Sequence, residues 1–180
     1  MVYMFLADGF EEVEALTPLD LLRRAGADVK TVAIGGGEYV TGSHGIVVKA
    51  DIKEADFSYD APEMVILPGG MPGTLNLGAS KTVTGAVMRA YEEGKYVAAI
   101  CAAPSVLGKL GILRGREAIC FPGFEEYLDG ARISEARVVC DGNIITAAGM
   151  GVALDFGLEA VGALFGEKKA EELRAAVLAD

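Results

Sequence analysis

Short, uninterrupted apolar runs alternate along this chain with longer segments that carry helical periodicity. The clearest apolar runs are Val2–Ala7, Met64–Leu67 and Tyr96–Ile100. A strand that is apolar at consecutive positions is buried on both faces, as happens in parallel sheets covered by helices on each side. The alternation therefore predicts an α/β sandwich with a mainly parallel sheet and helices on both of its faces.

The first helix is predicted over residues 11–26. Val13, Leu16, Leu19 and Leu22 recur there at helical spacing, and the segment closes with two arginines, an alanine and a glycine. Basic residues in a last turn and a terminal glycine are helix-stop signals. With the apolar runs on either side, this helix completes one βαβ unit.

Other elements follow from the same patterns. Ser80 is a suitable N-cap for a helix. Asp141 with Gly142, or Gly142 with Asn143, lies between two apolar runs, which predicts a hairpin. The remaining expected elements are a strand at 27–36, a β excursion at 38–51, helices at 80–94 and 104–113, a short strand at 117–121, the hairpin at 136–149 and helices from 151 onward.

Composition limits the classes of function. A 180-residue chain with 52% hydrophobic residues suits one well-packed domain, here 1–180. The net charge of −10 argues against a nucleic-acid partner, which requires a basic surface. No apolar run reaches the roughly 18 residues that cross a membrane, and the first residues do not resemble a secretion signal. We therefore expect a cytoplasmic protein without a membrane partner.

The metal-binding residue types are few. The three cysteines, Cys101, Cys120 and Cys140, are odd in number and lack CxxC spacing, and His44 is the single histidine. The usual zinc patterns cannot be assembled from this set, so no metal and no cofactor is expected. Free thiols point to a reducing compartment.

Cys101 lies where a predicted strand meets a predicted helix. Pro104 fits the first helical position, so the chain turns sharply over 101–103, and such a turn exposes its central side chain in a strained conformation. The N–H groups of Ala102 and Ala103 are expected to lack helical partners and to favour negative charge, which predicts a thiol pKa below the free value of about 8.5. The alternative is a small buried hydrophobe, which is the interpretation for the other two cysteines.

Three glutamates open the first helix. Acidic residues in a first turn are ordinary caps, and that interpretation suffices for Glu11 and Glu12. Glu14 differs because its helical neighbours form a mostly apolar strip, and Pro18 cannot donate to its carbonyl. A carboxylate in such surroundings is expected to have a raised pKa and to share a proton with an anion.

The glycine-rich stretch "LPGGMPG" at 67–73 follows a predicted strand. It is either a simple turn or a backbone that approaches a reacting atom closely, and it matches no phosphate-binding spacing. An oxyanion hole formed by the N–H groups of Gly70 and Ala102 is one arrangement it allows. Since sites in such sheets lie beyond the carboxyl ends of strands, we expect the loops at 8–10, 67–73 and 100–104 to matter most.

Four stretches together resemble the ThiJ/PfpI superfamily, and specifically its DJ-1 branch: "ADGFEEVEALTPLDLLRRAG", "LPGGMPG", "AAICAAPSVL" and "AAGMGVALDFGLEAV". The resemblance implies a flavodoxin-like three-layer sandwich of the class I glutamine amidotransferase type, usually a homodimer. It implies Cys101 as the reactive nucleophile, Glu14 as its acid/base partner, and Gly70 and Ala102 as backbone donors.

Three further positions take meaning from the resemblance. Arg24 and His44 match positions that approach the pocket at the dimer interface, and His44 stands where an arginine is frequent. Glyoxalase members of the family carry a histidine where this chain has Phe121, a side chain that cannot move a proton.

The resemblance implies a cysteine-dependent activity on small 2-oxoaldehydes or their glycation adducts, of the glyoxalase III or deglycase type (a lyase or hydrolase). The substrate would be a small carbonyl compound. One alternative is a redox-sensing or stress-response chaperone that acts through Cys101 oxidation without turnover. Another is an inert scaffold or binding module. Thiazole-phosphate synthesis in thiamine metabolism attaches to such sequences by analogy alone.

Overall fold

A seven-stranded sheet forms the centre of the computed structural model, which describes residues 1–179. The strand order is β10-β11-β7-β6-β1-β2-β5, and every neighbouring pair is parallel except β10 with β11. The strands are β1 (Val2–Ala7), β2 (Val29–Ile34), β5 (Ile52–Lys53), β6 (Met64–Leu67), β7 (Tyr96–Ile100), β10 (Val138–Asp141) and β11 (Ile144–Ala147). The prediction of a mainly parallel sheet is confirmed.

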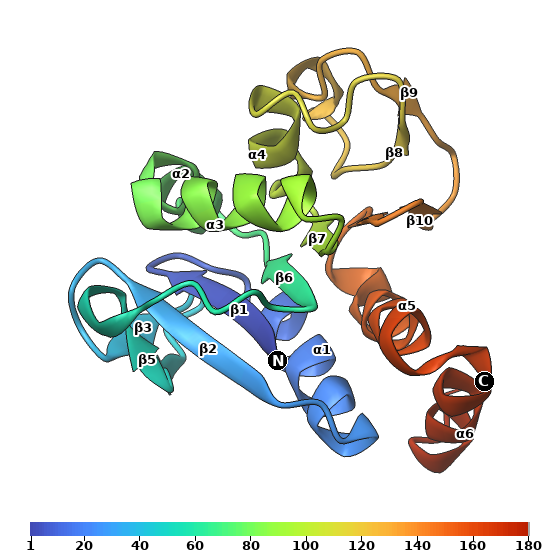
Figure 1. Ribbon diagram of the computed structural model, residues 1–180, viewed down its shortest axis with the longest axis horizontal. Helices are drawn as coiled ribbons and strands as arrows, with labels where there is room; N and C mark the ends of the chain where they lie inside the picture. Colours follow the sequence, from blue (N-terminus) through green and yellow to red (C-terminus); the bar gives the residue numbers. More distant parts are fainter. Residues whose placement is uncertain (180) are drawn as a thin grey trace.

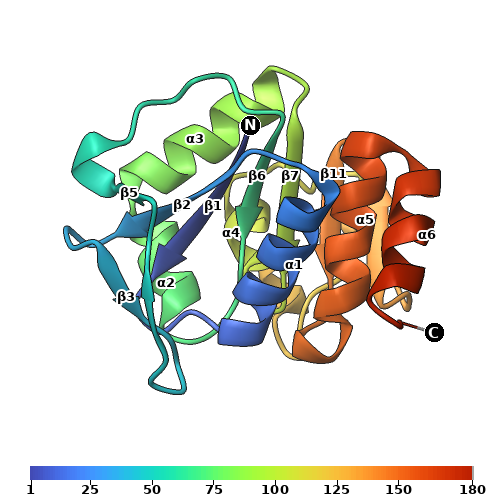
Figure 2. The ribbon, with the colours of Figure 1, turned by 90° about the horizontal axis from the view of Figure 1, so that it is seen from below.

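Helices cover both faces of this sheet, which makes three layers (Figures 1 and 2). On one face lie α1 (Glu12–Ala25) and α5 (Ala153–Phe165), with α6 (Glu167–Ala176) packed against α5. On the other lie α2 (Gly73–Ala79), α3 (Lys81–Glu92) and α4 (Pro104–Lys109). Within residues 1–179, no helix combines the length and the apolar character that crossing a membrane requires.

Several short elements lie outside the central sheet and its helices. Two-stranded sheets form from β3 (Tyr39–Thr41) with β4 (Val47–Lys49), and from β8 (Glu117–Ala118) with β9 (Arg132–Ile133). Single 3₁₀ turns cover Glu54–Asp56, Glu125–Tyr127 and Met150–Val152. The expected β excursion at 38–51 is thus the β3–β4 hairpin, whereas the strand expected at 117–121 is only two residues long.

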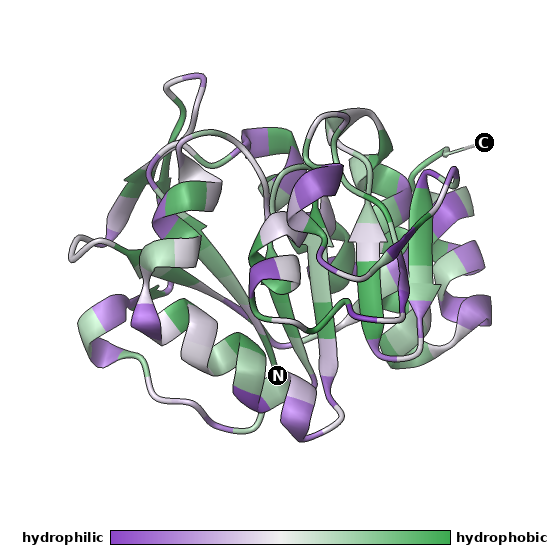
Figure 3. Cartoon of the chain, turned by 90° about the horizontal axis from the view of Figure 1, so that it is seen from above, coloured by the Kyte–Doolittle hydropathy of each residue, from purple (hydrophilic) through white to green (hydrophobic). Residues whose placement is uncertain are grey.

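Strand β1 explains why the sheet sequences are apolar at consecutive positions. Val2, Met4 and Leu6 belong to the core under α1 and α5, while Tyr3 and Phe5 belong to the core under α2, α3 and α4. Alternate side chains point to opposite faces of a strand, so a strand between two helical layers must be apolar throughout. Figure 3 shows the result: the strands are mainly green, and the helices carry purple stretches.

The helical caps follow their sequence signals. The Ser80 hydroxyl accepts a hydrogen bond from the Val83 N–H (3.2 Å), as an N-cap does. Gly26 ends α1 in the left-handed region with φ of 95°. The expected hairpin joins β10 to β11, and of the two predicted turns it has the one formed by Gly142 and Asn143. Helix α2 had no prediction, because its sequence is short and glycine-rich.

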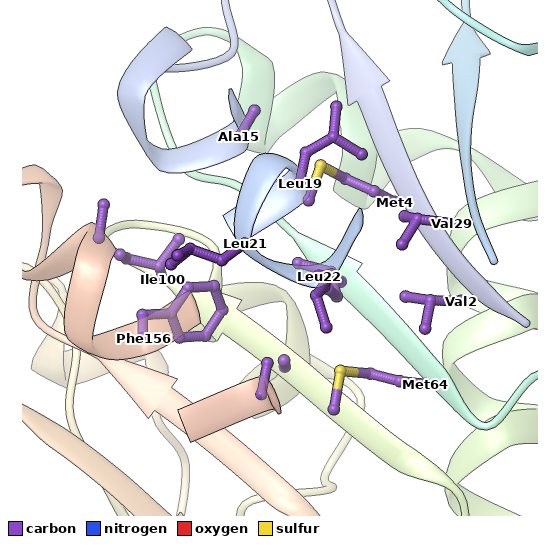
Figure 4. Packing of buried hydrophobic residues seen from close by; sticks show 14 of the residues in the cluster. Val2, Met4, Ala15, Leu19, Leu21, Leu22, Val29, Met64, Ile100 and Phe156 are labelled. Atoms are coloured by element: carbon purple, nitrogen blue, oxygen red, sulfur yellow. The ribbon is translucent and has the colours of Figure 1, made fainter. Parts of the chain in front are cut away.

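Helix α1 buries a face different from the predicted one. Leu19 and Leu22 are buried as expected, and Figure 4 shows them among the core side chains. Val13, however, is 43% exposed, whereas Glu12 and Glu14 are buried. Apolar spacing alone could not reveal this, because the first turn of the helix faces the loops beyond the sheet rather than the core.

Close contact between α1 and α5 depends on Gly157. A Cβ atom at this position would lie 2.6 Å from the Cδ1 atom of Leu21 and 2.9 Å from the Cα atom of Pro18. Gly162, in the same helix, has only the Cβ of Ala170 nearby, at 3.8 Å. The two glycines therefore form a matched pair, of which one is required by packing.

We predict that Gly157→Ala lowers the free energy of unfolding by about 1–3 kcal/mol, because the added methyl group overpacks the α1–α5 contact. Gly162→Ala should raise it by roughly 0.5–1 kcal/mol, since alanine is the better helix former and space is available. Urea denaturation of both variants measures the difference. Equal effects of the two substitutions would contradict this account of the packing.

Candidate functional site

Three loops meet beyond the carboxyl ends of β7, β6 and β1, which are neighbours in the sheet. The Gly73 N–H donates to the Gly9 carbonyl (3.1 Å), and the Glu11 N–H donates to the Gly69 carbonyl (2.9 Å). These hydrogen bonds join the loop after β1 to the loop after β6. Two of the loops that the sequence analysis singled out, 8–10 and 67–73, are therefore in direct contact.

Cys101 follows β7 in an unusual backbone conformation. Its φ is +64°, a left-handed value shared by only two other described non-glycine residues, Ala61 and Leu178. Its own N–H donates to the Ala147 carbonyl (2.9 Å), and its carbonyl accepts from the Phe121 N–H (2.8 Å). Neighbouring elements thus hold the strained turn on both sides, and the predicted sharp strand-to-helix turn is confirmed.

The Glu14 carboxyl is buried beside Cys101. It is 1% exposed, and its Oε2 atom accepts a hydrogen bond from the Gly69 N–H (3.0 Å). The other oxygen, Oε1, is buried without a partner of good hydrogen-bonding geometry among residues 1–179, while the Cys101 thiol lies close enough to influence the carboxyl. Burial raises the pKa of Glu14 to about 7, as expected for a carboxyl in apolar surroundings.

Gly69 allows this pair to approach. A Cβ atom on Gly69 would lie 2.6 Å from Oε2 of Glu14 and 2.7 Å from the Cβ atom of Cys101. Any larger residue would therefore separate the carboxyl from the thiol or move the loop. Of the two interpretations of "LPGGMPG", close backbone approach is the one that the structure supports.

The pKa of the Cys101 thiol moves in the direction opposite to our expectation. Burial and the neighbouring Glu14 raise this pKa to about 12, and hydrogen bonds from the N–H groups of Ala102 and Gly70 only partly oppose the rise. In addition, the Ala103 N–H donates to the Ile100 carbonyl (3.0 Å), so it is not free to stabilise the sulfur. The expected low thiol pKa is wrong, because desolvation and a carboxylate neighbour outweigh the backbone dipoles.

Glu14 and Cys101 consequently behave as one titrating pair. Near pH 7 the pair loses its first proton, and the carboxyl has the lower pKa of the two. Above pH 7, the Glu14 carboxylate is therefore the base positioned to take the thiol proton. Chemically, the arrangement provides a nucleophile with its own proton acceptor, and the N–H groups of Gly70 and Ala102 beside the sulfur.

Glu11 and Glu12 have different structural roles at the start of α1. Glu11 is the N-cap, accepting a hydrogen bond from the Glu14 N–H (2.7 Å), as predicted. Glu12 is not a simple cap: it is buried, its Oε1 atom accepts from the His44 N–H (2.7 Å), and its Oε2 atom pairs with Nδ1 of His44 (2.7 Å). Hydrogen bonds from His44 lower the pKa of Glu12 to about 2 despite burial, and Glu12 raises the pKa of His44.

Sequence reasoning missed this anchoring role of Glu12, because its partner is 32 residues away. The one hint in the sequence is that the single histidine, His44, lies in a polar loop between two glycines. The ligand atoms of Glu11, Glu12 and His44 lie within 4.8 Å of one another and could hold a cation. However, the hydrogen bonds given above already use these groups.

The remaining residues discussed in the sequence analysis do not all lie at the Glu14–Cys101 site. Arg24 pairs with Asp20 (2.6 Å) and lies ten residues beyond Glu14, about 15 Å along α1, so within one chain it does not approach the site. Phe121 is half exposed, and its ring lies against Gly149. Cys120 is buried as expected, but Cys140 is exposed and is not the small buried hydrophobe that was predicted.

Comparisons with known proteins are consistent with this geometry. Residues 1–163 match the model of the DJ-1/PfpI family. Protein DJ-1 homolog A of Arabidopsis thaliana is 36% identical over 176 residues, which cover 96% of this chain but 45% of that longer protein. Deglycase PYRAB04690 of Pyrococcus abyssi is 32% identical over 149 residues, covering 81% and 88% of the two chains. The solved structure described as "Toxoplasma gondii DJ-1, oxidized" has a TM-score of 0.95 at 33% identity, covering 98% and 97%.

The Glu12–His44 pair makes stability depend on pH in a defined window. The raised pKa of His44 stabilises the fold at pH values below the ordinary histidine pKa of about 6.5. This stabilisation is lost as the pH rises through the pKa that His44 has in the folded protein. The lowered pKa of Glu12 stabilises the fold at pH values above the ordinary glutamate pKa of 4.5, and this stabilisation is lost as the pH falls through about 2.

We predict that Glu12→Gln lowers Tm most between about pH 4.5 and 6.5, and returns the NMR-measured pKa of His44 toward 6.5. Asp20→Asn, which removes an exposed pair, is the control, and an unchanged pKa of His44 in Glu12→Gln would contradict the assignment.

Proposed function

The chain belongs to the DJ-1/PfpI family, as its motifs predicted, and on that premise we propose that it acts on small 2-oxoaldehydes or their glycation adducts. Cys101 is the nucleophile and Glu14 the general acid/base. The observation that carries the proposal is the buried Glu14 carboxyl: its Oε1 atom has no hydrogen-bond partner among residues 1–179, and the neighbouring Cys101 thiol lowers the pKa of the carboxyl. A relative named as a deglycase gives independent support.

The first step forms a covalent adduct. The Glu14 carboxylate takes the thiol proton while the sulfur attacks the aldehyde carbon, so that a C–S bond forms and the electron pair of the C=O bond moves to oxygen. The N–H groups of Gly70 and Ala102 donate to that oxyanion. The product is a hemithioacetal once the oxygen is protonated.

The second step moves hydrogen between adjacent carbons. The Glu14 carboxylate removes the proton from the carbon bonded to sulfur, and the electron pair of the neighbouring C=O bond moves to its oxygen, which gives an enediolate. The Glu14 carboxyl then returns this proton to the neighbouring carbon, while the hydroxyl proton on the carbon bonded to sulfur passes to the neighbouring oxygen. This isomerisation yields a thioester of a 2-hydroxy acid. Water then cleaves the thioester, releasing the acid and restoring the thiol, so the overall change is addition of one water to the oxoaldehyde.

Glu14 is the only proton carrier that this mechanism uses from the chain. Glyoxalase relatives carry a histidine where Phe121 stands, and a phenyl ring transfers no proton. Phe121 adjoins the nucleophile through its N–H bond to the Cys101 carbonyl. We therefore expect slow turnover of simple oxoaldehydes such as methylglyoxal.

We predict that Phe121→His raises kcat for methylglyoxal by about tenfold, because a second acid/base group adjoins the nucleophile. Phe121→Leu is the matched control and should leave kcat unchanged. Steady-state formation of lactate measures both variants. The same gain in the leucine variant would show that ring size, and not proton transfer, limits the rate.

The Cys101–Glu14 pair predicts a characteristic pH profile. The alkylation rate of Cys101 by iodoacetamide should rise through about pH 7 in the wild type, as the Glu14 carboxylate forms and accepts the thiol proton. In Glu14→Gln this rise should disappear. In the turnover assay, Cys101→Ser should lose at least about 100-fold. Alkylation profiles that coincide, or full turnover by the serine variant, would refute the proposal.

The family implies a homodimer, and we include it in the proposal as a cytoplasmic assembly. Four apolar side chains in the first turn of α1, the β3–β4 hairpin and the 3₁₀ turn before α5 are exposed: Val13, Ile46, Val47 and Met150. The Ile46 N–H donates to Glu12 (3.4 Å), which places Ile46 near His44. Covering these side chains with a second copy would bring a partner surface to the rim of the site. Light scattering of the purified protein measures the mass.

Redox sensing is the second candidate, favoured by the relative whose structure is described as oxidized. Two equivalents of peroxide would convert the Cys101 thiol to a sulfinic acid and release two molecules of water. Intact mass after mild peroxide treatment distinguishes the functions. Two added oxygens confined to Cys101, without aldehyde turnover, favour sensing, whereas oxidation spread over the three cysteines counts against it.

A further inference from the structure

A cavity of about 300 Å³ lies among α2, α3 and α4. These helices are grouped on one side of the sheet (Figure 1). None of the residues that line it belongs to the Glu14–Cys101 pair. Its size is at the lower end of the range for small-molecule sites.

The cavity contains a buried hydroxyl group without a partner. Thr74 lines it and is 2% exposed, and its Oγ1 atom has no hydrogen-bond partner within residues 1–179. Ser105, a second residue with a hydroxyl group, also lines the cavity and is buried. By contrast, the Thr84 hydroxyl donates to the Ser80 carbonyl (3.0 Å). Because buried polar groups are normally paired, the hydroxyl of Thr74 indicates a missing partner atom.

The remaining lining selects the chemistry of that partner. Val106 and Leu110 supply apolar wall, and Lys109 adds an exposed cation. Among the described residues, Lys109 forms no ion pair with a carboxylate. Its Nζ atom lies 5.2 Å from the centre of the Tyr127 ring. Hydroxyl donors and a free ammonium group beside apolar walls suit an anion with a short apolar tail.

We propose that this cavity binds a short-chain monocarboxylate of about four to six carbons. The carboxylate accepts hydrogen bonds from the Thr74 and Ser105 hydroxyl groups and pairs with Lys109. The chain lies against Val106 and Leu110. This proposal needs no catalytic role for Cys101, so binding can be tested whether or not the protein turns over an aldehyde.

The cavity is connected to the backbone donors around the sulfur. The Thr74 N–H donates to the Gly70 carbonyl (2.9 Å), and the Ser105 N–H donates to the Ala102 carbonyl (3.1 Å). Gly70 and Ala102 are the residues whose N–H groups act to lower the pKa of the Cys101 thiol. A ligand held between Thr74 and Ser105 therefore fixes α2 against α4 and sets the spacing of the two donors. This coupling, unlike binding, rests on the proposed function of Cys101.

Hexanoate is the probe, titrated into the full-length protein by NMR of backbone amides. We expect saturable shifts at Thr74 and Ser105, with a dissociation constant on the order of millimolar for so small a ligand. Thr74→Val should weaken binding at least fivefold while the protein stays folded, because valine replaces the unpaired hydroxyl with a methyl group. Thr74→Ser, which keeps the hydroxyl, should retain the affinity.

A second set of measurements tests whether binding requires the charges of Lys109 and of the ligand. Lys109→Met should weaken hexanoate binding at least fivefold, with the exposed Lys81→Met as the control, and hexan-1-ol should bind at least fivefold more weakly than hexanoate. Absence of saturable shifts, or equal affinity in Thr74→Val, would overturn the site, and equal binding of the alcohol would overturn the carboxylate class. Saturating hexanoate should change the alkylation rate of Cys101 at least twofold. An unchanged rate, with binding intact, would overturn the coupling alone.

Discussion

The burial of the Glu14 carboxyl against the Cys101 thiol is the constraint on which the site depends. Burial raises the pKa of the Glu14 carboxyl from the ordinary 4.5 to about 7. At pH values where the group is ionised, this shift lowers the free energy of unfolding by an amount on the order of 3 kcal/mol. The fold offsets that cost through packing elsewhere, as in the α1–α5 contact. In return, a proton acceptor is kept beside a strained cysteine and away from bulk water.

The sheet topology is what makes this contact local in space although it is distant in sequence. Adjacent parallel strands place the ends of β1, β6 and β7 side by side. Gly69 then leaves the space in which the Glu14 carboxyl and Cys101 lie close together. Glu12 adds a second buried carboxyl in the same helical turn, but hydrogen bonds from His44 keep it ionised. Two neighbouring glutamates on one helix thus have pKa values of about 2 and about 7 because their partners differ.

Much of this could be predicted from the sequence, for identifiable reasons. Consecutive apolar residues predicted the parallel sheet, and Pro104 after Cys101 predicted the sharp turn. The apolar neighbours of Glu14 predicted its raised pKa. The thiol pKa was predicted in the wrong direction, because a sequence shows which backbone dipoles adjoin a cysteine but not how deeply the sulfur is buried. The role of Glu12 was missed for a similar reason, since it depends on His44 across the fold.

The central claim is that Glu14 holds a proton near neutral pH because it is buried beside Cys101. A pH titration of the Glu14 carboxyl carbon by ¹³C NMR tests it most directly. The account predicts a midpoint near 7, and a higher midpoint in Cys101→Ala, because the thiol contact lowers the carboxyl pKa. A midpoint near 4.5 in the wild-type protein, unmoved by removal of the sulfur, would contradict it.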